Sequence, residues 1–263
     1  MNTDEYKLIA ETKYKEIEDK YGLTVYGSSN HKDFKLVFAR GRKADKNDLM
    51  PTENRFGYPP PKYCNELGRA NYPKYPVMYA GESVKVIGSE LGLNKDDWMH
   101  LAIYHTPEPI RFEYLLLLHD GINKENQWHK ILGEFKQFIK EHHPASHSKS
   151  PEEVWQRIQS AAMAFRNHSY DETAAIAYHW LYVRNIDAIL YPSLVSDDYC
   201  NFALNPDFVD KNLSLYRVHA CKWKGEHIEL HYTGSLESES VVWRTTNRDD
   251  FNEFESAYSN LES

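Results

Sequence analysis

The stretch "LGRANYPKYPVMYAGESVKVIGSE" (residues 67–90) combines a loop, a strand and a helix. Residues 76–80 form a short apolar run, which predicts a buried strand. Residues 82–92 predict a helix that ends in a glycine. The apolar residues of this helix recur at helical spacing, at Val84, Ile87 and Leu91. Glu90 lies near the edge of the face they form, whereas a solvated glutamate would more often lie opposite it.

The segments around this unit show both strand and helix patterns. Residues 4–21 have helical spacing and end before Gly22, and residues 123–183 are strongly helical in pattern, with a capping-type start at 150–158. Further strands are predicted at 35–40, 100–106, 111–120, 186–191, 214–223 and 227–233. Residues 44–74 form a long loop rich in proline, glycine and asparagine. Loops of this length inside a compact protein are usually functional or disordered, and the aromatic residues in this one favour order.

Strands that flank a helical block predict an α+β fold. We expect one domain over residues 1–263, with an N-terminal helical extension over about 1–30 and a helical insertion over about 123–170. The stretch "HHPASHSKS" (142–150) is the only part of the chain that resembles a linker.

The composition is that of a soluble globular protein, with 41% hydrophobic and 14% aromatic residues. The net charge of −8 argues against direct binding to a nucleic-acid backbone, which requires a basic face. Three cysteines without CxxC spacing (Cys64, Cys200 and Cys221) indicate reduced thiols. The charged N-terminus does not resemble a signal peptide, and no apolar run is long enough for a membrane span. We therefore expect a cytoplasmic protein.

Several common kinds of site are not indicated by the sequence. The thirteen histidines include no HExxH or HxH pairing, and His142 and His143 are adjacent, so their side chains diverge. Ser193 has no GxSxG context, which argues against an acyl-transfer nucleophile. Neither phosphate-binding glycine motif is present. We expect no metal and no bound cofactor.

Three blocks of the sequence place polar residues beside predicted strands. In "VFARGRK" (37–43), Arg40 and Arg42 are two residues apart and share one face if the strand continues. Arg69 and Asn71 precede the strand at 76–80. In "NIDAILYPSLVSDDYCNFALNP" (185–206), a proline stops the strand and small hydrogen-bonding residues follow, among them Ser193 and Asn201. Each of these residues taken alone is more often an ordinary surface or turn residue.

Taken together and in this order, the three blocks resemble the RES-domain family, which is named for an arginine, a glutamate and a serine. The second block matches without a gap through "GRANYPKYPVMYAGESVKVIGSE", and the resemblance covers about residues 35–206. Two features depart from the family pattern. Ala70 replaces the usual aromatic residue, and the segment of about 123–170 is longer than in compact members.

The resemblance implies a mixed β core similar to that of ADP-ribosyltransferases. It also implies an NAD-degrading toxin of a bacterial toxin–antitoxin pair, which mostly releases nicotinamide, with phosphorolysis and ADP-ribosyl transfer as variants. The expected partner is an antitoxin protein with a helix-turn-helix region that blocks the active site. The family further suggests a homo-oligomer, although no coiled-coil heptad supports it here.

The chemistry of NAD explains why such residues would be needed. An arginine fork matches the pyrophosphate oxygens, which suits Arg40 or Arg42 and Arg69. Cleavage of the nicotinamide–ribose bond develops positive charge on the ribose, which a carboxylate stabilises. We expect that carboxylate to be Glu90, with Glu82 as the competing candidate.

The expected site then falls into two groups. The catalytic group is Glu90, Arg69 and Ser193. The group that binds NAD is Arg40, Arg42, Asn71, Tyr79 and Asn201, with the ring of Tyr79 stacked on nicotinamide. The sequence also leaves open a non-catalytic alternative, in which the helical block at 123–183 binds a partner protein and the three blocks are only structural.

Overall fold

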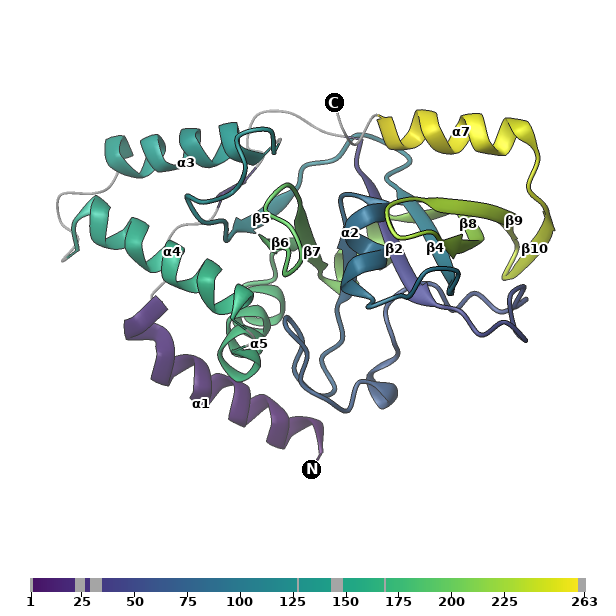
Figure 1. Ribbon diagram of the computed structural model, residues 1–263. Coiled ribbons are helices and arrows are strands. Elements are labelled where there is room, and N and C mark those ends of the chain that lie inside the picture. The colour runs from purple at the N-terminus through teal and green to yellow at the C-terminus, as the bar shows by residue number, and fades with distance from the viewer. Residues whose placement is uncertain are drawn as a thin grey trace.

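The computed structural model of the protein describes residues 2–21, 27–28, 35–126, 128–142, 149–167 and 169–259 (Figure 1). Ten strands of these residues form one sheet in the order β1-β5-β6-β7-β3-β2-β4-β8-β9-β10. The strands are β1 (Gly27–Ser28), β2 (Val37–Lys43), β3 (Met78–Gly81), β4 (Trp98–His105), β5 (Glu113–Leu116), β6 (Ala188–Pro192), β7 (Cys200–Leu204), β8 (Ser214–Trp223), β9 (Ile228–Glu237) and β10 (Ser240–Thr245). Strands β5 and β6 pair in parallel and the other neighbours are antiparallel, so the sheet is mixed.

The helices of the described residues gather mainly beside one end of the sheet, next to β5 and β6 (Figure 1). They are α1 (Thr3–Tyr21), α2 (Val84–Glu90), α3 (Trp128–His142), α4 (Pro151–Arg166), α5 (Tyr170–Tyr178) with a π-helical turn (His179–Val183), α6 (Pro206–Asn212) and α7 (Arg248–Ser259). A single 3-10 turn (Pro61–Tyr63) interrupts the long loop before β3. Helices and a mixed sheet in this arrangement confirm the predicted α+β class.

Most of the predicted elements are present, with boundaries shifted by a few residues. The helix predicted at 82–92 is α2, and the helical block at 123–183 contains α3, α4 and α5. Helix α4 begins with a complete capping box between Ser150 and Glu153, as its sequence predicts. Strands β1, β7 and β10 and helices α6 and α7 were not predicted, and β1 lies within the extension that was predicted to be helical. Within the predicted extension α1 ends at Tyr21, and residues 143–148 of the linker-like stretch lie outside the described residues.

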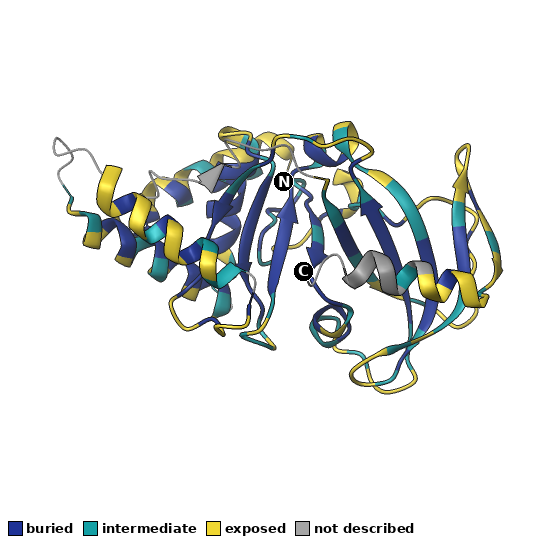
Figure 2. Ribbon diagram, turned by 90° about the horizontal axis from the view of Figure 1, so that it is seen from above, coloured by how far each residue is buried: buried dark blue, intermediate teal, exposed yellow. Residues whose placement is uncertain are grey.

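Two hydrophobic clusters lie on the two faces of the sheet. The larger cluster joins the sheet to α1, α4 and α5, and in Figure 2 the helices on the left turn their buried residues toward the strands. The smaller cluster lies under α2 and consists of Ala39, Ile87, Met99, Leu101, Ile103 and Cys221. Helix α2 is therefore anchored on β2, β4 and β8 by its buried face.

The centre of the sheet is open between β2 and β3. These strands pair at one position, where Ala39 lies opposite Gly81, and beyond it the ladder between them stops. Strand β2 continues to Lys43 but pairs only with β4 there. The two strands thus separate next to the C-terminal end of α2, which leaves space for a cavity inside the sheet.

Two helical glycines allow a test of how tightly α2 packs. A Cβ atom on Gly88 would lie 2.6 Å from Cε3 of Trp223, whereas a Cβ atom on Gly133 in α3 would meet nothing within 4 Å. We expect Gly88→Ala to lower the free energy of unfolding by about 1–3 kcal/mol through overpacking. The matched control Gly133→Ala should raise it by about 0.5–1 kcal/mol, because alanine restricts the unfolded chain. Urea unfolding measures both, and equal effects would contradict the packing of α2 described above.

Candidate active site

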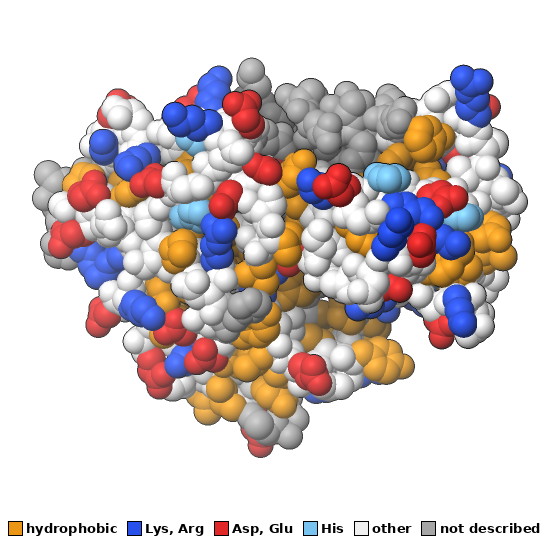
Figure 3. All heavy atoms as spheres, in the orientation of Figure 1, with side chains coloured by type: hydrophobic (Ala, Val, Ile, Leu, Met, Phe, Trp, Pro, Cys, Tyr) orange, Lys and Arg blue, Asp and Glu red, His pale blue; other side chains and the backbone are white. Residues whose placement is uncertain are grey.

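A cavity of about 600 Å³ lies where β2 and β3 separate. Its walls come from β2, β3, the end of α2, the loop that precedes β3, and residues of β6, β7 and α5. The polar and aromatic lining residues are Arg40, Arg42, Lys43, Arg69, Asn71, Tyr79, Glu90, Tyr170, Tyr191 and Asn201. In Figure 3 the surface is hollowed between α2 and the loop below it. The cavity therefore brings together seven of the eight residues that the sequence singles out, and Ser193 is the one outside its lining.

Arg40 and Arg42 bring positive charge to the wall of the cavity. Arg40 donates a hydrogen bond to the carbonyl oxygen of Tyr79 at 3.0 Å, and its buried Nε has no partner among the described residues. Arg42 donates to the carbonyl oxygen of Arg55. Neither forms an ion pair with a carboxylate of the described chain. Burial and the neighbouring Arg42 lower the pKa of Arg40 to about 10, so it remains charged at neutral pH.

The carboxylate of Glu90 is held by four groups. Its Oε1 accepts hydrogen bonds from the Ser193 hydroxyl at 2.9 Å, the Leu194 backbone N–H at 2.9 Å and the Asn201 amide at 2.8 Å. Its Oε2 forms an ion pair with Arg69. The side chain is 16% exposed, so the carboxylate faces the cavity from a mostly buried position. This arrangement fixes one rotamer of Glu90.

These contacts keep Glu90 ionised. Burial opposes ionisation, but the charge of Arg69 and the hydrogen bonds from Leu194 and Asn201 outweigh burial and hold the pKa of Glu90 below its ordinary value. A carboxylate that stays charged in a mostly buried cavity is suited to stabilise a nearby positive charge.

Both ends of the Arg69 guanidinium are bonded to the protein. One nitrogen contacts Glu90, and the other donates to the carbonyl oxygen of Pro192 at 3.2 Å. The guanidinium carbon also lies 5.1 Å from the centre of the Tyr191 ring. Arg69 therefore connects the loop before β3 to Glu90 and to the end of β6.

Asn71 and Tyr79 brace the loop that carries Arg69. The Tyr79 hydroxyl donates to Asn71 Oδ1 at 2.8 Å and accepts from the Ala70 N–H at 2.8 Å. A side chain on Gly68 would lie 2.2 Å from Asn71 Oδ1, so glycine is needed there. Because the Tyr79 hydroxyl is fixed on the loop, its ring has a defined position in the cavity wall.

Ser193 lies behind Glu90. It is fully buried, and its hydroxyl accepts from the Val195 N–H at 3.1 Å while donating to Glu90. A group in this position orients the carboxylate. Asn201, by contrast, both contacts Glu90 and lines the cavity.

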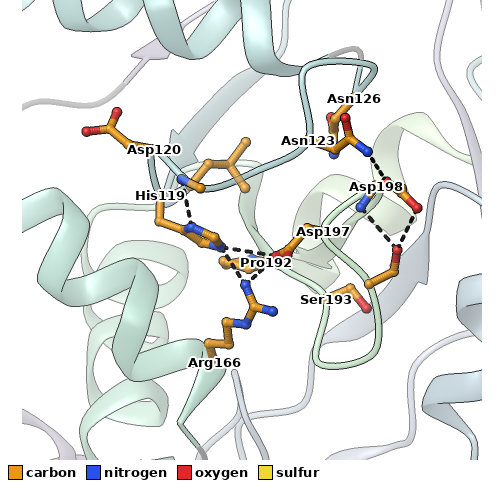
Figure 4. A network of polar contacts seen from close by, with 12 residues as sticks. His119, Asp120, Asn123, Asn126, Arg166, Pro192, Ser193, Asp197 and Asp198 are labelled. Atoms are coloured by element: carbon orange, nitrogen blue, oxygen red, sulfur yellow. Dashed lines mark hydrogen bonds and ion pairs between the residues drawn. The ribbon is translucent and has the colours of Figure 1, made fainter.

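The loop after Ser193 is anchored from its far side by the helical block (Figure 4). Arg166, the last residue of α4, forms an ion pair with Asp197 and lies 2.9 Å from Nε2 of His119. Asn123 bonds the same loop twice, through its N–H to the carbonyl oxygen of Asp197 at 3.0 Å and through its amide to Asp198 at 2.6 Å. Arg166 and Asn123 thus hold residues 197–198 of the loop that follows Leu194, whose N–H donates to Glu90.

Two aromatic residues that line the cavity were not predicted from the sequence. Tyr191 directly precedes the Pro192–Ser193 pair, but its position in an apolar run indicates only a core residue. Tyr170 begins α5 in the helical block, and no local signal points it toward the cavity.

Glu82, the competing carboxylate, does not line the cavity. It is buried, accepts from the Trp128 indole N–H and accepts from the Cys200 N–H at 2.6 Å. These contacts join the end of β3 to α3 and β7, so the role of Glu82 is structural.

Two other kinds of feature are absent from the described ranges. Among those residues, no group of three or more His, Cys, Asp and Glu side chains is arranged to hold a metal ion. None of the helices described is both long and apolar enough to cross a membrane.

Comparisons with known proteins place this geometry in a family context. The family model described as RES domain matches residues 39–233, which is more than half of the chain. A comparison with curated protein sequences finds no match. Among solved structures, a similar chain comes from the crystal structure of the M. tuberculosis MbcT–MbcA toxin–antitoxin complex, with 10% identity, a TM-score of 0.40, and coverage of 97% of this chain and 98% of that chain. At this TM-score the likeness carries no argument about function.

The charge of Arg69 should control the ionisation of Glu90. In Arg69→Gln the burial of Glu90 remains but its strongest opposing charge is lost, so the pKa of Glu90 should rise. The pKa of Glu90 is lower in the folded protein than in the unfolded chain, so its ionisation contributes stability above about pH 4.5. This contribution is lost as the pH falls through the folded-state pKa. The variant should be destabilised by roughly 1–3 kcal/mol at neutral pH, with the difference shrinking in acid.

Carboxyl NMR titration and unfolding at several pH values measure both effects. Arg69→Lys keeps the charge and should retain most of the pKa shift. The exposed Arg111, replaced by Gln, serves as a control with little pH dependence. An unchanged Glu90 pKa in Arg69→Gln would show that the ion pair is not what holds it.

Proposed function

Since the chain belongs to the RES-domain family, we propose that it consumes NAD by cleaving the nicotinamide–ribose bond and acts in the cytoplasm as the toxin of a toxin–antitoxin pair. The choice of NAD as the substrate rests on membership of this family. The observation that supports it most directly is the charge arrangement of one cavity, in which Arg40 and Arg42 have no carboxylate partner among the described residues and Glu90 is held ionised.

NAD carries both charges that such a cavity complements. Its pyrophosphate is an anion, for which the guanidinium groups of Arg40 and Arg42 are suited by shape and charge. Its nicotinamide ribose becomes cationic as the bond breaks, and the Glu90 carboxylate stabilises that charge. Because Glu90 is already bonded by Ser193, Leu194 and Asn201, little reorganisation is needed when the charge develops.

The reaction balances without a redox partner. The bond between the ribose carbon and the nicotinamide nitrogen breaks, and its electron pair leaves with nicotinamide, which becomes neutral. The ribosyl cation is captured by an oxygen of water, of phosphate or of a protein side chain, and the proton of a captured hydroxyl goes to solvent. The acceptor thus decides between hydrolysis, phosphorolysis and ADP-ribosyl transfer.

The contacts divide the arginines into two roles. Arg40 and Arg42 are the groups for the pyrophosphate, since neither is paired with a carboxylate of the described chain. Arg69 is a positioning residue, because both of its bonded nitrogens hold protein groups, Glu90 and the Pro192 carbonyl. We expect the ring of Tyr79, whose hydroxyl is bonded to Asn71, to stack on nicotinamide.

Incubation of the purified protein with NAD, followed by chromatography of nicotinamide, tests the reaction and the role of Glu90 together. Glu90→Gln keeps the shape of the side chain but removes the charge, so turnover should fall about a hundredfold or more while NAD still binds. Glu82→Gln is the matched control, because Glu82 is buried outside the cavity and its replacement should leave far more activity.

Two outcomes would contradict this assignment. If Glu82→Gln abolishes turnover and Glu90→Gln keeps it, the catalytic carboxylate is Glu82. If the unaltered protein releases no nicotinamide even with phosphate and cell lysate supplied, the alternative is favoured, in which the helical block binds a partner and the cavity is not catalytic.

The toxin role predicts an effect on growth. Expression without an antitoxin should deplete NAD and arrest growth, whereas Glu90→Gln expressed to the same level should not. Growth curves with NAD measured in extracts check this. A strain that grows normally while it contains active, NAD-cleaving protein would contradict the toxin role but not the reaction.

A further inference from the structure

A second pocket of about 830 Å³ adjoins the cavity that contains Glu90. Arg42 lines both spaces, so they meet at its side chain. The second pocket is built from the loop before β3, from β4 and from the junction of α6 and β8. Its aromatic and proline residues are Tyr58, Pro59, Pro60, Tyr63 and Tyr104.

The charged groups follow an order along the two spaces. Glu90 and Lys43 line only the first cavity, and Arg42 lines both spaces. Arg55, Glu53 and Asp210 line only the second pocket, where Arg55 is ion-paired with Asp48 and Asp210 accepts from the Tyr58 hydroxyl. The Arg42 guanidinium is bonded to the backbone carbonyl oxygen of Arg55, so the two basic residues are neighbours at the junction. A ligand that spans both spaces therefore meets a carboxylate, then cationic groups, then an aromatic pocket.

The groups of NAD follow the same order. The nicotinamide ribose comes first, the pyrophosphate second and the adenosine third. With the ribose at Glu90 and the pyrophosphate at Arg40 and Arg42, the adenosine reaches the second pocket. We propose that this pocket is the binding site for the adenosine half of the dinucleotide, an inference that rests on the proposed function.

The tyrosines of the pocket are suited to a purine. Tyr58 is held by a hydrogen bond from its hydroxyl to Asp210 at 2.6 Å, and Tyr104 is buried in the wall. Tyr63 is 67% exposed, and the Lys62 ammonium lies 4.8 Å from the centre of its ring, so the opposite face of the ring is the one available to a base. Stacking of a base on an aromatic ring contributes about 1–3 kcal/mol. The volume also lies within the range of roughly 300–1,000 Å³ found for small-molecule pockets.

The test compares NAD with nicotinamide mononucleotide, which has the same scissile bond but lacks the adenosine half. The unaltered protein should prefer NAD. Tyr63→Ala should lower kcat/KM for NAD by about tenfold or more, the scale of one lost stacking contact, and leave kcat/KM for the mononucleotide unchanged. Tyr63→Phe keeps the ring and should restore the preference for NAD.

Phe138→Ala is the control, because Phe138 is a similarly exposed aromatic residue on α3 outside both pockets. Equal use of the two substrates by the unaltered protein would overturn the inference and leave the proposed reaction standing. The same conclusion would follow if Tyr63→Ala lowered kcat/KM equally for both substrates, or for neither. If the unaltered protein cleaves neither substrate, the proposed function itself fails and the inference falls with it.

Discussion

The site depends on the separation of β2 from β3 in the middle of the sheet. A central strand ordinarily has its backbone N–H and C=O groups paired on both edges, and unpaired buried groups are costly. Here the ladder ends after Ala39 and Gly81, and Arg40 replaces part of it by donating to the Tyr79 carbonyl oxygen. One side chain therefore satisfies a carbonyl oxygen of the opened edge and brings a positive charge into the opening. A fully paired sheet would have no cavity here.

The second requirement is that Glu90 reach this opening with its charge intact. Helix α2 is anchored by its buried face, and Glu90 is its last residue, so the carboxylate projects from a fixed end. The backbone N–H that donates to Glu90 belongs to Leu194, and the loop that follows is anchored by Arg166 through Asp197 (Figure 4). The helical block is thus joined by direct contacts to the loop that orients the carboxylate, although it lies beside the sheet.

The sequence predicted the local units better than the way they assemble. The strand and helix around Glu90 follow from apolar spacing, and the three blocks place seven of eight expected residues around one cavity. Strand β7 was missed because its residues follow a polar stretch that resembles a loop, yet all five are buried by pairing with β3 and β6. The role of Arg69 could not be derived from spacing, since its partners, Glu90 and Pro192, are distant in the chain. Long-range contacts of this kind decide which arginine is free for a ligand.

The unequal pairing of the arginines has an energetic consequence. Arg69 is neutralised by Glu90, whereas the buried Nε of Arg40 has no partner in the part of the chain that the structure describes. Burial and the charge of Arg42 lower the pKa of Arg40. An uncompensated charge in a partly buried position destabilises the empty protein, and an anion that binds there removes the penalty. Part of the binding free energy of an anionic ligand is then the relief of this repulsion. Because Glu90 is paired with Arg69, both Arg40 and Arg42 keep their charges without a carboxylate partner among the described residues.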